Sequence, residues 1–155
     1  MLHPQVFKAL CASLLAAGSL KLLPRVDLFC NPQGDNSLCE EYKHVGNGVG
    51  TRDFLLDPQE CYWANPPYTE EAVLGLLQAV QAQRPGGIVM IIPAYISSGE
   101  KVHRAIKAMP YLHKAKSFAT GSDLFSRPSL GSREAGFATR WPVDVFHACA
   151  RNPFE

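Results

Sequence analysis

The 155-residue sequence lacks the cysteine and histidine spacings of a metal or redox site. Its five cysteines are odd in number and include no C-x-x-C pair, and the five histidines share no ligand spacing with them. We therefore expect no metal site. Most of the cysteines lie among apolar residues, as buried free thiols do; these are Cys11, Cys30, Cys61 and Cys149. Free thiols predict a reducing, intracellular compartment, the cytoplasm or the nucleus, with an organelle as the open alternative.

No apolar run is long enough to cross a bilayer, so no membrane association is expected. The segment Ala9–Leu15 resembles the short apolar region of a signal peptide, but no basic region precedes Lys8. We favour a packed first helix over Pro4–Ala17, with Gly18 as its C-cap. A single domain is predicted over residues 1–150, with 151–155 as a tail.

A strong net charge is also missing, since the sum is only +1. Up to Tyr95 there are six Lys/Arg against nine Asp/Glu, and after it nine against five. The excess of basic residues in the second half suggests contacts with a polyanion such as DNA, for which Lys101, Arg104, Arg127 and Arg133 are the candidates. The alternative is a set of ordinary solvated surfaces.

Apolar patterning predicts an α/β fold. Val73, Leu76, Leu77 and Val80 mark one face of a helix, and the unbroken apolar run Ile88–Ala94 follows it as a central strand covered on both faces. A helix followed by a buried strand is typical of a parallel sheet with helices on both faces. Further strands are expected at 25–30, 61–63, 116–120 and 143–149. Ser97 and Glu100 suggest a capping box for another helix, and 121–136 suggests a surface loop.

The segment Trp63–Tyr68 is the main functional candidate. It reads as the carboxyl end of a strand entering the turn Asn65-Pro66-Pro67-Tyr68, which two prolines make rigid. Ligands bind above such strand ends in open α/β sheets. The Asn65 amide oxygen and the carbonyl beside Pro66 are suited to accept both N–H groups of an exocyclic amine and localise its lone pair for methylation. Tyr68 is suited to stack on a flipped-out base. The alternative is a turn that only ends the strand.

Two acidic positions are candidates for the cofactor side of such a site. Asp27 lies inside the apolar strand 25–30, where a carboxylate must be paired or must serve a ligand. Both interpretations remain open. Asp53 and Phe54 are candidates for holding a purine between a polar group and an apolar side chain. The glycines of 46–50 lack the strand-before, helix-after setting of a phosphate-binding loop.

Taken together, these segments resemble the Dam-like N6-adenine DNA methyltransferases of phages and the related methyltransferase-like domain of DIRS-type retroelements. The resemblance runs in order over nearly the whole chain. It rests on Asn65-Pro66-Pro67-Tyr68, and on Val26–Gln33, Arg52–Leu55, Val89–Ala94 and Thr120–Phe125. It implies a compact Rossmann-like methyltransferase fold that uses S-adenosylmethionine. By the same resemblance the catalytic residues are Asn65, Pro66, Pro67 and Tyr68, and the cofactor side includes Asp27, Phe29 and Asp53.

The sequence departs from this family at several positions. The turn after Cys30 is poor in glycine, His3 stands where the family has a hydroxyl residue, and Ser122 stands where it has Arg. The span from Asp27 to Asn65 is short for two complete strand–helix units. Two alternatives to an enzyme therefore stay open: a catalytically inactive domain that binds nucleic acid, and a structural subunit of a larger complex.

Overall fold

The computed structural model describes residues 2–30, 33–44, 55–127 and 132–149, with the backbone alone for 44, 126–127 and 132–138. The chain contains, in order, α1 (Pro4–Ala16), β1 (Val26–Cys30), β2 (Glu41–His44), β3 (Cys61–Ala64), α2 (Glu70–Gln83), β4 (Gly87–Pro93), α3 (Ala94–Ser97), α4 (Glu100–Lys107), β5 (His113–Phe118), β6 (Asp123–Arg127), β7 (Ser132–Ala138) and β8 (Val143–Cys149). The expected tail, 151–155, lies outside the described residues.

The central feature is a six-stranded sheet in the order β2-β1-β3-β4-β8-β5. The pairs β1–β2, β1–β3 and β3–β4 are parallel, whereas β8 runs antiparallel to both β4 and β5. Five strands therefore share one direction and β8 alone is reversed. The predicted Rossmann-like α/β class with a mainly parallel sheet is confirmed.

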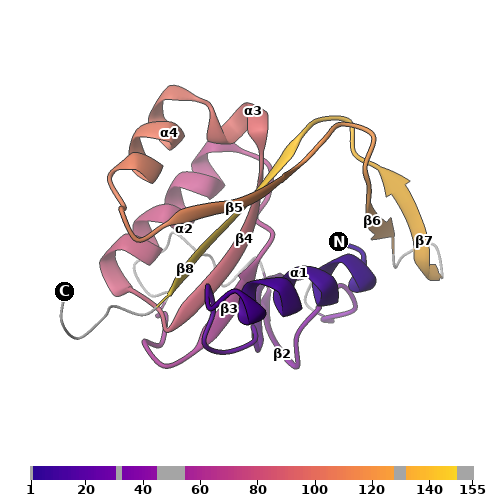
Figure 1. Ribbon diagram of the computed structural model, residues 1–155, viewed down its shortest axis with the longest axis horizontal. Coiled ribbons are helices and arrows are strands. Elements are labelled where there is room, and N and C mark those ends of the chain that lie inside the picture. Colours follow the sequence, from indigo (N-terminus) through magenta and orange to yellow (C-terminus); the bar gives the residue numbers. More distant parts are fainter. Residues whose placement is uncertain (1, 31–32, 45–54, 128–131, 150–155) are drawn as a thin grey trace.

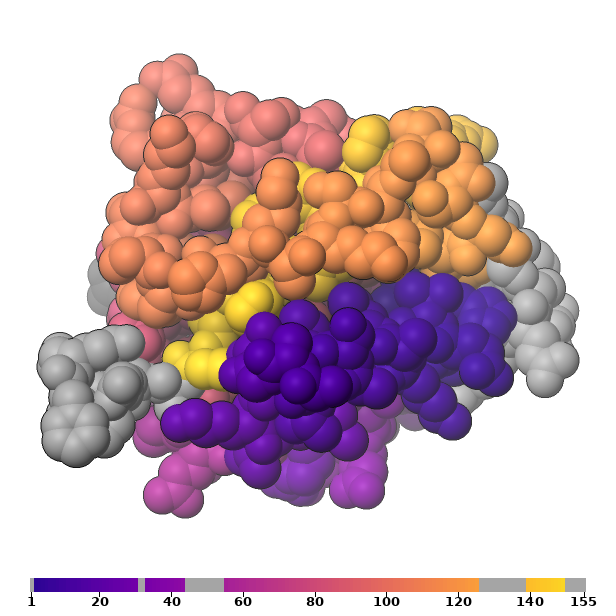
Figure 2. Space-filling view, in the orientation of Figure 1, coloured from indigo at the N-terminus to yellow at the C-terminus, as the bar shows by residue number. Residues whose placement is uncertain are grey.

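Helices cover both faces of this sheet, as expected (Figure 1). The face with α2, α3 and α4 buries an apolar cluster that includes Tyr62, Ile88, Met90 and Phe146. The opposite face carries α1, whose indigo atoms lie at the front of the molecule in Figure 2, and Leu10 and Leu14 pack against the other side of the same strands. The strands of the sheet centre are buried on both sides, which accounts for their unbroken apolar runs.

α2 follows the pattern that predicted it. Thr69 caps its first turn by accepting a hydrogen bond from the Ala72 N–H at 3.2 Å, and Glu70 and Glu71 complement the helix dipole there. The predicted apolar face is completely buried. The helix ends at Arg84, whose backbone is left-handed with φ of 45°.

α1 forms where it was predicted, but its C-cap is Ala17 and not Gly18. His3 caps it by accepting a hydrogen bond from the Gln5 N–H at 3.2 Å, Pro4 occupies its first turn, and Gly18, with φ of 74°, follows its end. Within the described residues no helix combines the length and the apolar character needed to cross a bilayer.

Two further local predictions are wrong. The capping box is absent, because Gly99 is the N-cap of α4 and the Ser97 hydroxyl instead donates to Asp144 Oδ2 at 2.7 Å. The proposed loop 121–136 contains β6 and most of β7, an antiparallel pair attached to the N-terminus by a Leu2–Phe125 bridge. Burial of Leu124 and Phe125 against the α1 side stabilises strands that Ser and Gly composition alone disfavours.

The strand order places a topological switch point between β1 and β3. From β1 the chain passes to β2 on one side, and then to β3 and β4 on the other side. Ligands in open α/β sheets bind at such a point, above the carboxyl ends of the strands. Because β5 runs parallel to β4 and β8 returns antiparallel, the β6–β7 pair that joins them projects from this same edge.

Candidate active site

The Asn65–Tyr68 turn lies at the switch point. Asn65 directly follows β3, and Trp63 two residues earlier pairs with Asp27 of β1. Pro66 is buried and Pro67 is exposed, while the Thr69 N–H donates to the Pro67 carbonyl at 2.8 Å and leads the chain into α2. The expected strand end and stiffened turn are therefore present at the edge of the sheet where a ligand is expected.

The Asn65 amide is the most informative polar group of this turn. Its Oδ1 atom is buried and has no hydrogen-bond partner among the described residues. Leaving a buried acceptor unpaired costs about 1–3 kcal/mol, so such atoms in native proteins call for a specific explanation. A ligand N–H group would supply the missing donor.

Three aromatic rings gather at Trp141, and one of them, Tyr68, belongs to the same turn as Asn65. Trp141 lies between Tyr68 and Tyr95, with ring centroids 6.2 Å and 5.4 Å away and edge-to-face angles of 82° and 83°. Tyr95 is 54% exposed, whereas Tyr68 packs against both apolar clusters. The indole Nε1 of Trp141 is buried without a partner in the described structure. The site therefore offers ring surfaces, one unpaired acceptor and one unpaired donor.

The Tyr68 hydroxyl is not suited to act as a base. Burial raises the pKa of this phenol well above its ordinary value, and the neighbouring Tyr95 adds to the effect. Tyr68 remains neutral throughout the physiological range. Its contribution to a ligand is its ring.

Asp27 is buried and holds the turn that follows β1. Its side chain is 2% exposed, Oδ1 accepts from the Phe29 N–H at 3.3 Å, and Oδ2 accepts from the Leu38 N–H at 3.0 Å. Burial raises the pKa of this carboxyl to about 6, although both backbone hydrogen bonds favour the ionised form. These two hydrogen bonds support the interpretation of Asp27 as a structural carboxylate. A contact between Asp27 and a cofactor stays a prediction.

The other predicted cofactor residues divide into two groups. Phe29 is buried in the cluster beneath α2. Asp53 and Phe54 lie outside the described residues, as do Asn31 and Pro32 of the turn after β1. Their predicted roles stay predictions.

A second buried carboxylate, Asp144, was not singled out by the sequence. It lies at the start of β8 and accepts hydrogen bonds from Ser97 at 2.7 Å and Ser117 at 2.6 Å. It thereby joins α3, β5 and β8 close to the aromatic rings. An acidic residue within the apolar run 143–149 is the same signal that drew attention to Asp27.

The four basic candidates are not brought together. Lys101 and Arg104 lie on α4 beside acidic partners, at 3.8 Å from Glu70 and 2.8 Å from Glu100. Arg127 and Arg133 lie on β6 and β7, at the opposite end of the molecule from α4 (Figure 1). The β6–β7 pair projects from the edge that carries Asn65.

No group of three or more His, Cys, Asp or Glu side chains suited to a metal ion occurs in the described part of the chain. All five cysteines are free thiols. The absence of a metal site stays a prediction.

Comparison with known proteins gives structural likenesses only. No family model and no curated protein matches the sequence. Among solved structures, a candidate RNA methyltransferase from Pyrococcus horikoshii is similar at 14% identity, with a TM-score of 0.49, over 96% of this chain and 83% of that protein. Precorrin-6y C5,15-methyltransferase from Geobacter metallireducens is similar at 14% identity, with a TM-score of 0.39, over 88% of this chain and 74% of that protein. The substrates named for these two proteins are not transferred to this chain.

Proposed function

We propose that this protein transfers a methyl group from S-adenosylmethionine to the N6 amine of adenine in DNA. One observation carries the proposal. The rigid Asn65-Pro66-Pro67-Tyr68 turn stands at the topological switch point, and it carries a buried amide oxygen without a partner among the described residues and a tyrosine ring in edge-to-face contact with Trp141. The sequence resemblance to the Dam-like methyltransferases gives the same assignment.

The proposed roles follow from the chemistry of the substrate amine. Its lone pair is delocalised into the base, so the amine is a weak nucleophile. The Asn65 Oδ1 atom and the Pro66 carbonyl accept its two N–H bonds and localise that lone pair. Tyr68 provides a ring against the base once it has left the helix stack, and Trp141 fixes the orientation of the Tyr68 ring by its edge-to-face contact.

Little catalysis beyond positioning is needed, because the amine can lose its proton after the new C–N bond has formed. The neutral Tyr68 phenol agrees with this, since no strong base is required. S-adenosylmethionine, when bound, supplies the electrophilic methyl group. The turn after β1, held by Asp27, and the Asn65 turn would flank it, because they border the switch point.

DNA contacts are assigned first to the β6–β7 pair. Arg127 and Arg133 belong to strands that project from the same edge as Asn65. Lys101 and Arg104 are secondary, because Glu70 and Glu100 already compensate their charges.

An inactive, methyltransferase-like domain is the second candidate, either as a nucleic-acid-binding module or as a structural subunit of a larger complex. One observation favours it. Asp27 is 2% exposed and each of its oxygens accepts a backbone N–H group, so its contacts in the structure are those of a residue that holds the backbone.

The test measures cofactor binding and methyl transfer separately. S-adenosylmethionine at a hundredfold its dissociation constant should add about 2.7 kcal/mol to the free energy of unfolding, seen as a rise in Tm. Transfer of tritiated methyl groups to an adenine-containing DNA duplex should then be detectable, with an RNA of the same sequence as the second substrate.

Asn65→Ala should abolish methyl transfer and leave the Tm of the free protein within a few degrees of the wild type, because it removes the amine acceptor and not a core contact. Gln78→Ala, on the exposed side of α2, is the matched control and should keep full activity. Retained turnover in Asn65→Ala would contradict the role given to the amide. Absence of any Tm rise at millimolar S-adenosylmethionine would favour the inactive domain.

A further inference from the structure

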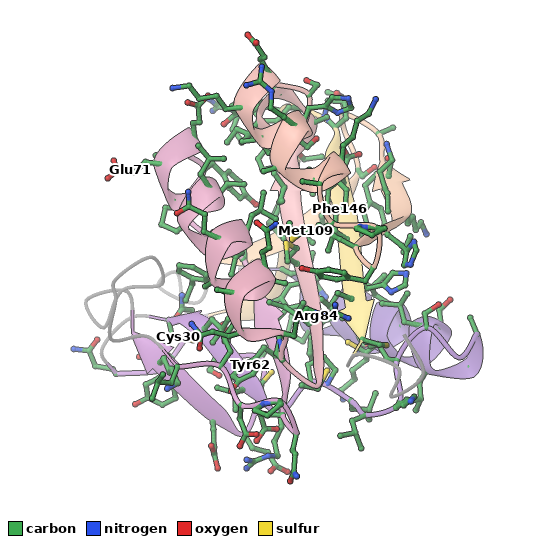
Figure 3. The ribbon with its side chains drawn as sticks, turned by 90° about the vertical axis from the view of Figure 1, so that its left-hand side faces the viewer. Cys30, Tyr62, Glu71, Arg84, Met109 and Phe146 are labelled. Atoms are coloured by element: carbon green, nitrogen blue, oxygen red, sulfur yellow. The ribbon has the colours of Figure 1, made fainter. Side chains whose placement is uncertain are left out.

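Tyr95 presents an exposed aromatic ring at the edge of the sheet that carries the Asn65–Tyr68 turn. β4 ends two residues before Tyr95 and runs parallel to β3, which ends one residue before Asn65. In Figure 3, Glu71 and Arg84 mark the two ends of α2, and the Glu71 end is the one that the turn leads into. The exposed ring therefore borders the candidate active site.

At least one face of the Tyr95 ring is left uncovered by its aromatic neighbour. The residue is 54% exposed, and its contact with Trp141 is edge-to-face, with the ring planes at 83° and the centroids 5.4 Å apart. In a pair of this geometry the face of one ring meets only the edge of the other. A flat aromatic surface in water beside a ligand site is suited to stack on a nucleobase.

The backbone that carries Tyr95 is held from two sides. The Ala94 N–H donates to the Pro142 carbonyl at 2.8 Å, and the Ser97 hydroxyl donates to Asp144 Oδ2 at 2.7 Å. Both hydrogen bonds join α3 to the beginning of β8. A ring on a fixed backbone has little freedom to lose when a ligand stacks on it, which favours binding.

Trp141 lies between this ring and the ring proposed for the target base. Its centroid is 6.2 Å from that of Tyr68 and 5.4 Å from that of Tyr95. β8 begins two residues after Trp141 and runs antiparallel to β4, which places Trp141 at the same edge. Each tyrosine therefore offers a surface of its own, as in proteins that stack successive bases of a single strand on successive aromatic side chains.

A positive charge accompanies the ring. Arg140 directly precedes Trp141 and is exposed, and it forms no ion pair within the described residues. A guanidinium stays charged at every physiological pH and is suited to contact a phosphate. A ring for the base together with a cation for the phosphate matches the chemistry of an unpaired nucleotide.

We propose that Tyr95 stacks on the nucleotide next to the target base in the same strand, and that Arg140 contacts the phosphate of that nucleotide. The identity of the target base rests on the proposed function. The added element is that the neighbouring nucleotide also leaves the helix stack. A single strand should therefore bind more tightly than a fully paired duplex, in which this neighbour is held by its own base pair.

The stacking contact is tested by binding without cofactor, using fluorescence anisotropy of a short, labelled DNA strand that contains one adenine. Tyr95→Ala should weaken binding about fivefold or more, whereas Tyr95→Phe keeps the ring and should bind as the wild type does. Leu22→Ala is the matched control, since Leu22 is 55% exposed and precedes β1 at the opposite edge of the sheet. The Tm of each variant confirms that it is folded.

The position of the stacked nucleotide is tested with abasic sites. Removing the base next to the adenine should abolish the difference between wild type and Tyr95→Ala, and removing the adenine should leave that difference in place. Arg140→Gln should reduce the slope of log K against log salt by about 0.7 for a single strand. Lys21→Gln, on the exposed segment before β1, is its control and should keep the wild-type slope.

Equal binding by wild type and a folded Tyr95→Ala would overturn the proposal, as would tighter binding of the fully paired duplex. A Tyr95 effect that disappears only when the adenine is removed would overturn the assignment to the neighbouring nucleotide. An unchanged slope in Arg140→Gln would overturn the phosphate contact. Tyr95-dependent binding without methyl transfer would support this inference and contradict the proposed methyl transfer, so the two can fail separately.

Discussion

Asp27 and Asp144 show how a carboxylate is accommodated inside this sheet. Asp27 accepts one backbone N–H group from β1 itself and one from Leu38 after it, whereas Asp144 accepts two serine hydroxyl groups. In both cases the carboxyl group is buried, and the hydrogen bonds of Asp144 join segments that are distant in sequence. Residues of this kind hold the loops above the sheet in place.

Replacing Asp27 should change how stability depends on pH. The raised pKa, about 6 against an ordinary 3.8, means that the folded state binds a proton more tightly than the unfolded state. The contribution of this group is therefore fully present below pH 3.8 and is lost as pH rises to about 6, by roughly 3 kcal/mol at most. Asp27→Asn should remove this decline. Urea denaturation of both proteins from pH 4 to pH 7.5 measures it, and parallel pH curves would show that Asp27 titrates normally.

The residues of the candidate site were only partly accessible from sequence. Asn65 and Tyr68 follow an apolar run that ends in two prolines, and this local signal placed them at a strand end. Trp141 was missed because its position beside Tyr68 depends on the reversed direction of β8. Ser97 was assigned to a helix cap because a capping-box pattern shows nothing of the distant Asp144 that takes its hydroxyl.

At the scale of elements, the helix that leaves the candidate site can be tested through its cap. Thr69→Ala removes the acceptor for the Ala72 N–H and should lower the free energy of unfolding by about 1 kcal/mol. Thr69→Ser keeps the hydroxyl and should stay within a few tenths of the wild-type value. Urea denaturation at one pH compares the three proteins, and equal midpoints would show that the cap contributes nothing.

The β6–β7 pair can be tested by the salt dependence of DNA binding, which rests on the proposed function. Arg127→Gln combined with Arg133→Gln should reduce the slope of log K against log salt by about 2, since each phosphate contact contributes about 0.9. Lys101→Gln combined with Arg104→Gln is the matched pair and should change the slope less, because acidic neighbours compensate those charges. The reverse ranking would place the DNA on α4.

Elements with their own apolar periodicity were predicted well. α2 and β4 have the expected bounds within a few residues, because a buried face leaves a regular pattern. The β6–β7 pair was not predicted, since its strands are stabilised by contacts with Leu2 and α1 and not by local preference. The reversed direction of β8 could not be predicted from the sequence either, because this strand is buried on both sides whether it runs parallel or antiparallel to its neighbours.

At the scale of the whole molecule, the five cysteines serve as reporters of global unfolding. Burial raises the pKa of every one of these thiols, so hardly any thiolate exists at pH 8. A disulfide reagent such as DTNB should react slowly with the native protein and with all five thiols in guanidinium chloride. Rapid native reaction of one thiol would show that the fold opens locally around it.

The N-terminal attachment of the β6–β7 pair has a practical consequence for experiments. Leu2 forms a bridge with Phe125, and the His3 N–H donates to the Leu124 carbonyl at 2.6 Å. Any polypeptide joined ahead of these residues leaves the molecule alongside that pair. A bulky affinity tag there should obstruct the proposed DNA surface, and proteolytic removal of the tag should restore the lost affinity.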